Sequence, residues 1–170
     1  METRKVYMKF IFLFRKINLM IKILFVCHGN ICRSPMAEFI MKKFVKDAGR
    51  EQEFEIASAA TSTEEVGNPV YPPAKRILAD HGISCYGKTA RQMKRSDYDY
   101  YDILIGMDDA NIRNMIRISG GDPQKKIHLM MSYIGQTKSV ADPWYTDDFQ
   151  ATWDDVTVAC QALLNSIPRK

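Results

Sequence analysis

The sequence lacks the cysteine pattern of a domain held together by disulfides or by zinc. Its cysteines are too few and too unevenly spaced for a secreted disulfide scaffold: Cys27, Cys32, Cys85 and Cys160. No CxxC motif pairs with another, and the three histidines lie far apart, so no structural zinc site is expected. These absences indicate reduced thiols and predict a cytoplasmic protein.

Long runs of basic or of apolar residues are also absent. The formal net charge is only +4 and no stripe of Lys and Arg occurs, which argues against nucleic-acid binding. The stretch "MKFIFLF" has some signal-peptide character, but Arg15 and Lys16 interrupt it and no small-residue cleavage site follows. It is also too short to cross a bilayer, so no membrane association is expected. We interpret residues 1–19 as an N-terminal leader that is disordered or not native.

Residues 20–170 alternate short apolar runs with helical patterns, as expected of a single domain. Hydrophobic residues make up 46% of the chain and charged residues 26%, so a compact core can form. The apolar runs predict strands over 20–26, 54–60, 101–107 and 125–131. Helical spacing predicts helices over 34–49, 72–82, 108–118 and 149–167. This alternation predicts an α/β fold with a parallel sheet and helices on both faces.

The first strand-to-helix connection, "VCHGNICRSP" at 26–35, has the composition of an anion-binding loop. Ligands of parallel sheets bind where strands end and helices begin. Gly29 and Asn30 tolerate the backbone angles of a tight curl, which points successive N–H groups inward. Arg33 adds a planar fork that matches two phosphate oxygens. The same donors and the helix dipole favour the thiolate of Cys27, which can then attack phosphorus.

Ser34, at the end of this loop, has two expected roles. It can hydrogen-bond the sulfur of Cys27, and it can cap a helix that has Pro35 at its first position and ends near Gly49. No metal ion or other cofactor is required, because the loop amides and Arg33 supply the positive potential. The alternative for the whole loop is a tight turn with two buried thiols. The chain has no GxxxxGK[ST] motif, so this is not a nucleotide-binding loop.

A second Cys-x5-Arg spacing occurs at Cys85–Arg91. It follows a helix end and a turn, with no apolar strand before it and no helix start after it. We therefore interpret Cys85 as a structural residue.

Two Asp-Pro pairs compete for the role of proton donor to the leaving group. Asp122 lies between a helix and a strand and is typical of a turn. Asp142 lies in "ADPWYTDDF", a strand-to-helix connection on the sheet edge expected to hold Cys27. Trp144 and Tyr145 beside it are suited to flank an aromatic substrate, although ordinary loop packing is the alternative. Asp142 is the predicted acid.

From about Met20 to its C-terminus, the chain resembles the low-molecular-weight protein tyrosine phosphatase family. The motifs "CxGNICRSP", "SAATS", "VGNP", "HGI", "ARQ", "YDILIGMD" and "DPWY" occur in the family's order. The resemblance implies a three-layer α/β sandwich with a central four-stranded parallel sheet and the anion-binding loop after the first strand. It also implies metal-independent hydrolysis of phosphotyrosine in proteins, and of small aryl phosphates, through a cysteinyl-phosphate intermediate.

The resemblance also assigns roles to residues. Cys27 is the implied nucleophile, Arg33 binds the phosphoryl group, and Asp142 donates a proton. Asn30 and Ser58 resemble the polar residues that brace the loop. The predicted substrate-binding residues are His28, Gly29, Asn30, Ile31, Cys32, Ser34, Trp144 and Tyr145. The expected partners are tyrosine-phosphorylated proteins, and the expected assembly is a monomer or a weak dimer.

Four positions bear on substrate choice. Ile31 resembles the tyrosine-directed members, because the related arginine phosphatases tend to carry a smaller threonine there. His28 stands where the family often has an aliphatic residue or threonine, Glu64 where an aromatic residue usually walls the pocket, and Lys88 where a histidine is common. These departures predict a less hydrophobic pocket.

Cys32 resembles the family's second thiol, so a reversible Cys27–Cys32 disulfide that protects the nucleophile is a further hypothesis. Three other functions remain open. A protein arginine phosphatase and a thioredoxin-coupled arsenate reductase share this fold and loop. The reductase needs additional cysteines near a flexible segment, where Cys85 stands alone, while Cys160 falls on the packed side of a helix. The third is a non-catalytic phosphate-binding module.

Overall fold

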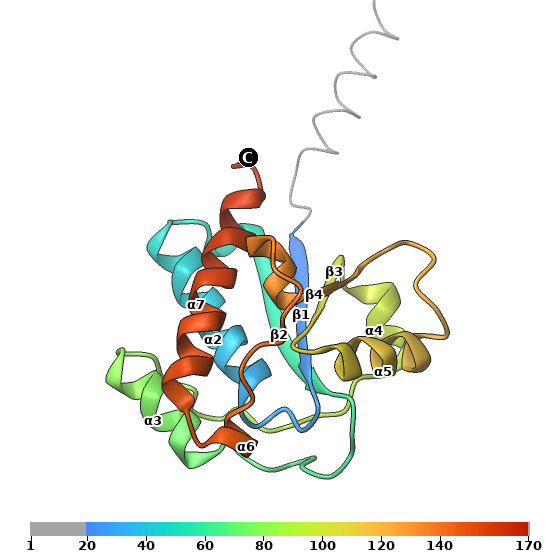
Figure 1. Ribbon diagram of the computed structural model, residues 1–170. Helices are drawn as coiled ribbons and strands as arrows, with labels where there is room; N and C mark the ends of the chain where they lie inside the picture. The colour runs from blue at the N-terminus through green and yellow to red at the C-terminus, as the bar shows by residue number, and fades with distance from the viewer. Residues whose placement is uncertain (1–19, 170) are drawn as a thin grey trace, which may run out of the picture.

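Four parallel strands form the centre of the molecule (Figure 1). The computed structural model describes residues 20–169, so the leader predicted over residues 1–19 lies outside the described residues. In sheet order the strands are β2 (Phe54–Ala60), β1 (Ile21–Cys27), β3 (Ile103–Gly106) and β4 (Ile127–Leu129). Each pairing is parallel, and the last residue of β1, Cys27, lies opposite the last residue of β2, Ala60. The carboxyl ends of the strands therefore share one edge of the sheet.

Helices cover both faces of the sheet and give the three layers that the sequence predicted (Figure 1). On one face, α2 (Arg33–Asp47) and α7 (Phe149–Ser166) pack together, and both contact α3 (Pro72–Asp80). On the other face, α4 (Arg95–Tyr100) packs against α5 (Asp109–Ser119). The remaining short elements are η1 (Glu51–Glu53), η2 (Met130–Ile134) and α6 (Pro143–Thr146). Within residues 20–169, no helix has the length and apolar character needed to span a bilayer.

The central strand β1 is buried on both faces, as its continuous apolar run predicted. Ile23 and Phe25 pack into the core beneath α2 and α7, whereas Leu24 and Val26 pack into a second cluster with residues of α4 and α5. All four side chains are fully buried. Alternate residues of one strand therefore anchor two cores, which fixes the end of β1 and the loop that follows it.

The predicted fourth strand is only partly correct. Residues 127–129 form β4, but Met130 and Met131 begin the 3-10 helix η2. Both methionines are buried. A continuous apolar run does not by itself distinguish a buried strand from a buried helical turn, which is why the prediction extended too far.

The start of α2 also differs from the prediction. Its N-cap residue is Cys32, Arg33 is the first helical residue, and no side chain makes a capping hydrogen bond. Ser34 is therefore not the N-cap, because its hydroxyl is used inside the loop. Pro35 is the third helical residue, where a backbone N–H would have no partner within the helix. At the other end, Gly49 follows the C-cap with a φ of +66°, as predicted for a helix stop.

Candidate active site

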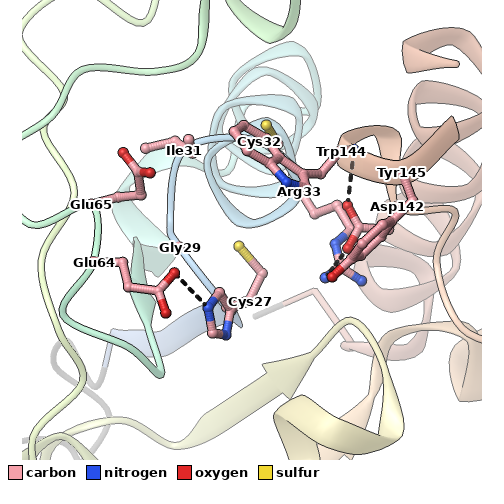
Figure 2. Close-up of a pocket in the computed structure, with 11 residues that line it drawn as sticks. Cys27, Gly29, Ile31, Cys32, Arg33, Glu64, Glu65, Asp142, Trp144 and Tyr145 are labelled. Atoms are coloured by element: carbon pink, nitrogen blue, oxygen red, sulfur yellow. Dashed lines mark hydrogen bonds and ion pairs between the residues drawn. The ribbon is translucent and has the colours of Figure 1, made fainter. Parts of the chain in front are cut away.

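A cavity of about 180 Å³ opens at the carboxyl end of β1 (Figure 2). The loop after β1, the start of α2, the connection after β2 and the region of α6 all contribute to it. The lining residues are Cys27, His28, Gly29, Ile31, Cys32, Arg33, Glu64, Glu65, Asp142, Trp144 and Tyr145. Among the predicted substrate-binding residues, Asn30 and Ser34 do not line the cavity and are buried. Residues that are far apart in the sequence thus meet in one pocket.

Cys27 is the last residue of β1 and is 4% exposed. The backbone N–H of Asn30 donates to its Sγ over 3.3 Å, and the Ser34 Oγ lies 3.1 Å from Sγ. The Ser34 hydroxyl also accepts a hydrogen bond from the Asn30 side chain and lies 3.4 Å from the carbonyl of Ala59. The Asn30 N–H and the Ser34 hydroxyl are thus two polar groups within hydrogen-bond distance of Sγ.

The loop backbone forms a concave set of donors. Asn30 adopts a left-handed conformation, with a φ of +59°, and is 1% exposed. Gly29 does not share that conformation; a Cβ there would lie 3.2 Å from the Cγ of Glu65, so close packing explains the glycine. Within the described part of the chain, the N–H groups of Gly29, Ile31 and Cys32 donate to no protein acceptor. Such a nest, at the start of a helix, is suited to an oxyanion.

Arg33 is buried in the pocket between two carboxylates. Its Nη1 lies 2.8 Å from Asp108 Oδ2 and its Nη2 lies 2.9 Å from Asp142 Oδ2. Burial disfavours the charged guanidinium, but the negative charges of Cys27, Asp142 and Asp108 outweigh it and raise the pKa of Arg33. The guanidinium is therefore permanently charged and held in a fixed plane at the cavity.

Asp108 is a site residue that the sequence analysis missed. It follows β3 and caps α5, with its Oδ1 accepting the N–H of Asn111 over 2.7 Å. Its other oxygen holds Arg33. The rule that pointed to Cys27, a polar residue where a parallel strand gives way to a helix, applies equally to Asp108 and could have found it.

Asp142 reaches the cavity because it caps the short helix α6. Its Oδ1 accepts the N–H of Trp144 over 3.1 Å, and Pro143 occupies the first helical position. This leaves Oδ2 to face Arg33. The side chains of Trp144 and Tyr145 line the cavity and are largely exposed, at 59% and 85%. They form an open aromatic wall beside the carboxyl group.

A buried chain of hydrogen bonds supports the loop from the side of the sheet. The Asn30 amide donates to Ser34 Oγ and to Ser58 Oγ, both over 2.8 Å, and its oxygen accepts the N–H of Arg91. Ser58 lies in β2 and donates in turn to Glu38 of α2 over 2.5 Å. The predicted bracing residues, Asn30 and Ser58, are therefore in direct contact.

Glu38 and Lys88 complete this chain. Lys88 Nζ lies 2.9 Å from Glu38 Oε2 and donates to the carbonyl of Ser58, while Lys42 pairs with the other oxygen of Glu38. Burial raises the pKa of Glu38, but the charges of Lys88 and Lys42 outweigh it, so the net shift is downward. Lys88 is absent from the cavity lining, so this departure from the family pattern acts on the loop support and not on the pocket wall.

The mouth of the cavity is polar on the side opposite the aromatic wall. His28 Nε2 lies 3.1 Å from Glu64 Oε2, and Glu65 accepts a hydrogen bond from Asn68 over 2.7 Å. Glu64 therefore lines the cavity, and the less hydrophobic pocket expected from it stays a prediction. Within residues 20–169, no group of three or more histidine, cysteine or acidic side chains is arranged to hold a metal ion.

The sequence matches the model of the low molecular weight phosphotyrosine protein phosphatase family over residues 22–170. The chain belongs to this family. It is 36% identical to the low molecular weight protein-tyrosine-phosphatase YfkJ of Bacillus subtilis over 89% of this chain and 98% of that protein. It is also 38% identical to the low molecular weight phosphotyrosine protein phosphatase of Gallus gallus over 84% of this chain and 92% of that protein.

Two solved structures share the fold of this phosphatase. The crystal structure of YfkJ superimposes with a TM-score of 0.85 at 36% identity, covering 89% of this chain and 96% of that one. The crystal structure of a Drosophila arginine phosphatase superimposes with a TM-score of 0.79 at 28% identity, covering 86% and 97% of the two chains. The four-stranded parallel sheet is thus the fold of the family, whose members are phosphatases and hence hydrolases.

The remaining candidate residues of this phosphatase are structural. Cys85 is buried, and Cys160 is fully buried with its Sγ against the carbonyl of Ala37 in α2. Asp122 accepts hydrogen bonds from Tyr98 Oη and from the N–H groups of residues 126 and 127, so it stabilises a turn, as predicted. Cys27 and Cys32 are both free thiols in this structure, and the disulfide between them stays a prediction.

Proposed function

We propose that this phosphatase hydrolyses phosphotyrosine in proteins, and small aryl phosphates, through a phosphocysteine at Cys27. The observation that carries the proposal is the convergence of Cys27, Arg33 and Asp142 on one cavity. Cys27 supplies a nucleophile among hydrogen-bond donors, Arg33 a fixed positive charge, and Asp142 an acid at the opening. Because the mechanism needs Cys27 as a reduced thiol, we expect the enzyme to work in the cytoplasm, where thiols are kept reduced.

In the first step, Cys27 Sγ attacks phosphorus as the thiolate. An S–P bond forms, the P–O bond to the tyrosine breaks, and Asp142 gives its proton to the departing phenolic oxygen. The N–H groups of the loop and the Arg33 guanidinium donate hydrogen bonds to the phosphoryl oxygens and stabilise their negative charge. In the structure, Asp142 contacts Arg33 directly. When substrate binds, its phosphoryl group takes the place of that carboxylate at the guanidinium, and Asp142 is then free to act on the leaving group.

In the second step, a water molecule attacks the phosphocysteine. The Asp142 carboxylate takes a proton from this water, the S–P bond breaks, and inorganic phosphate leaves with the thiolate of Cys27 restored. Ser34, 3.1 Å from Sγ, stabilises the thiolate as it departs. Asn30 and Ser58 hold Ser34 and the loop in place.

The cavity walls favour an aromatic ester. Ile31 is 8% exposed and packs with Cys32, Ala90 and Phe149, which makes one firm apolar wall. Trp144 and Tyr145 provide planar surfaces on another side, and a phenyl ring can stack on either. Similarity to the Drosophila arginine phosphatase makes phosphoarginine the second candidate substrate.

The decisive test is hydrolysis of an aryl phosphate in the presence of a metal chelator. We expect near-complete loss of activity for Cys27→Ser, and a loss of about 10²- to 10⁴-fold for Asp142→Ala that is largest with poor leaving groups. Cys85→Ser and Asp99→Ala are the matched controls, since Cys85 is equally buried and Asp99 is exposed, and both lie outside the cavity.

Four further measurements separate the alternatives. Rapid quenching followed by mass spectrometry should find phosphorus on Cys27, and its absence during turnover would overturn the mechanism. Comparison of phosphotyrosine and phosphoarginine peptides should favour phosphotyrosine. Arsenate reduction with thioredoxin should be absent, and phosphopeptide binding without phosphate release would instead indicate a binding module.

A further inference from the structure

Beside Ile31, two acidic side chains, Glu64 and Glu65, lie across the cavity from Asp142 and Tyr145 (Figure 2). His28 and Glu64 come from different connections, the loop after β1 and the loop after β2, and their side chains meet at 3.1 Å. Both remain open to solvent, with side-chain exposures of 57% and 69%. A contact between two exposed side chains at the pocket rim limits where the Glu64 carboxylate can lie.

A second carboxylate lies next to the first. Glu65 also lines the cavity, and Asn68 donates to its Oε2 over 2.7 Å. Its aliphatic stem packs close to Gly29 of the anion-binding loop. Figure 2 shows both acidic side chains on the same side of Cys27, across the cavity from Asp142.

Among the described residues that line the cavity, no exposed lysine or arginine balances these charges. Among the lining residues Arg33 is the sole permanent cation, and it is buried between Asp108 and Asp142. His28 is occupied by Glu64. The mouth is therefore locally acidic, although the whole chain carries a formal charge of +4. The phosphoryl group itself is held deeper, at the loop amides and Arg33, so the rim acts on the residues next to it: a negatively charged neighbour is repelled and a positively charged one is attracted.

We propose that Glu64, oriented by His28 and assisted by Glu65, is a specificity-determining residue that selects phosphotyrosine sites flanked by a lysine or arginine. This inference rests on the proposed function. The phosphoryl group occupies the loop above Cys27, so the substrate backbone and the residues next to the phosphotyrosine lie at the rim. A cationic neighbour pairs with Glu64 there, whereas an acidic neighbour meets like charge.

The expected preference is moderate, because the carboxylates are exposed and water screens them. An exposed ion pair changes a rate or binding constant by about one- to fivefold, and like-charge repulsion acts in the opposite direction by a similar factor. A peptide with arginine beside the phosphotyrosine should therefore have a kcat/KM about fivefold above that of the same peptide with glutamate. Alanine at that position should give an intermediate value. Salt should reduce the difference.

The test measures kcat/KM for three peptides that differ only in the residue beside the phosphotyrosine: arginine, alanine or glutamate. We expect the arginine-to-glutamate ratio to be about fivefold for the wild type and to fall below about twofold for Glu64→Gln. Glu51→Gln is the matched control and should keep the wild-type ratio, because Glu51 lies just before the amino end of β2, at the opposite edge of the sheet. Raising the salt concentration to 0.5 M should reduce the wild-type ratio by more than that of Glu64→Gln, in which only Glu65 of the two glutamates remains.

The possible failures can be told apart. If a small aryl phosphate is hydrolysed through phosphocysteine but the three peptides react equally, the inference is wrong and the proposed function stands. A wild-type ratio that survives in Glu64→Gln, or that does not respond to salt, also overturns the role of Glu64. If neither the aryl phosphate nor any peptide is hydrolysed, the proposed function fails and this inference fails with it.

Discussion

At the scale of single residues, the two thiols of the anion-binding loop are almost equally buried but have different roles in the proposed mechanism. Cys27 and Cys32 are 4% and 6% exposed. Burial, followed by the nearby charge of Cys27, raises the pKa of Cys32 to about 12. At neutral pH only about one Cys32 side chain in 10⁵ is then ionised. Cys32 therefore stays protonated at neutral pH, beside the thiolate that the proposed mechanism assigns to Cys27.

This difference predicts selective alkylation. Iodoacetamide at pH 7 should modify Cys27 in the folded enzyme and leave Cys32, Cys85 and Cys160 unmodified, because alkylation requires a thiolate. Peptide mapping by mass spectrometry gives the site of modification, and inorganic phosphate should protect it. The denatured chain, in which all four cysteines should react, is the control. Modification of Cys32 at a rate similar to that of Cys27 would contradict the assignment.

At the scale of elements, the Glu38–Lys88 pair joins α2 to β2 and to the segment before α4. The Glu38 side chain is 5% exposed and that of Lys88 13%. Through Ser58 and Asn30, this pair is hydrogen-bonded to the loop that carries Cys27. Removing one partner of a buried pair leaves the other charge without compensation, which is why such a change is far more disruptive than the loss of a surface pair.

Lys88→Met should therefore lower the free energy of unfolding by about 3 kcal/mol, somewhat less than a fully isolated charge would cost because Lys42 still contacts Glu38. Urea denaturation measures the change. Lys43→Met, in the helix α2 that also carries Glu38, is the control. Lys43 pairs with Asp47 at the surface, so its loss should lower the free energy of unfolding by less than about 1 kcal/mol. Glu38→Leu added to Lys88→Met should recover part of the loss. Equal effects of the two lysine variants would show that the buried pair has no special role.

At the scale of the whole molecule, the sequence predicted what repeats along an element and missed what depends on contacts between elements. The central strand and the long helices were correct because their apolar spacing extends over several turns or residues. The short helices α4 and α6 were not predicted, since an element of four to six residues has too few positions to display a period. Cys27, Arg33 and Asp142, which line one cavity, were singled out from local motifs. Glu38 and Lys88, 50 positions apart, gave no local sign that they would pair.

The whole fold also determines how stability should depend on alkaline pH. Burial raises the pKa of Cys32 and of Tyr133 to about 12, and it raises that of Cys160, which is fully buried between α2 and α7. In the unfolded chain these thiols ionise from about pH 9 and the phenol from about pH 10. The folded state keeps the protons, so ionisation above pH 9 stabilises the unfolded state alone.

The free energy of unfolding should accordingly be unaffected by these groups well below pH 9 and should fall between pH 9 and 12, each group contributing about 1.4 kcal/mol for every pH unit between its unfolded and folded pKa. Urea unfolding of the reduced protein between pH 7.5 and 11 tests this. Cys160→Ala is less stable at neutral pH because it leaves a small cavity, but it removes one of the ionising groups. Its stability should therefore decline less steeply than that of the wild type, so that the difference between the two narrows as the pH rises. A constant difference would mean that the Cys160 thiol ionises equally in both states, and that its burial does not suppress its charge.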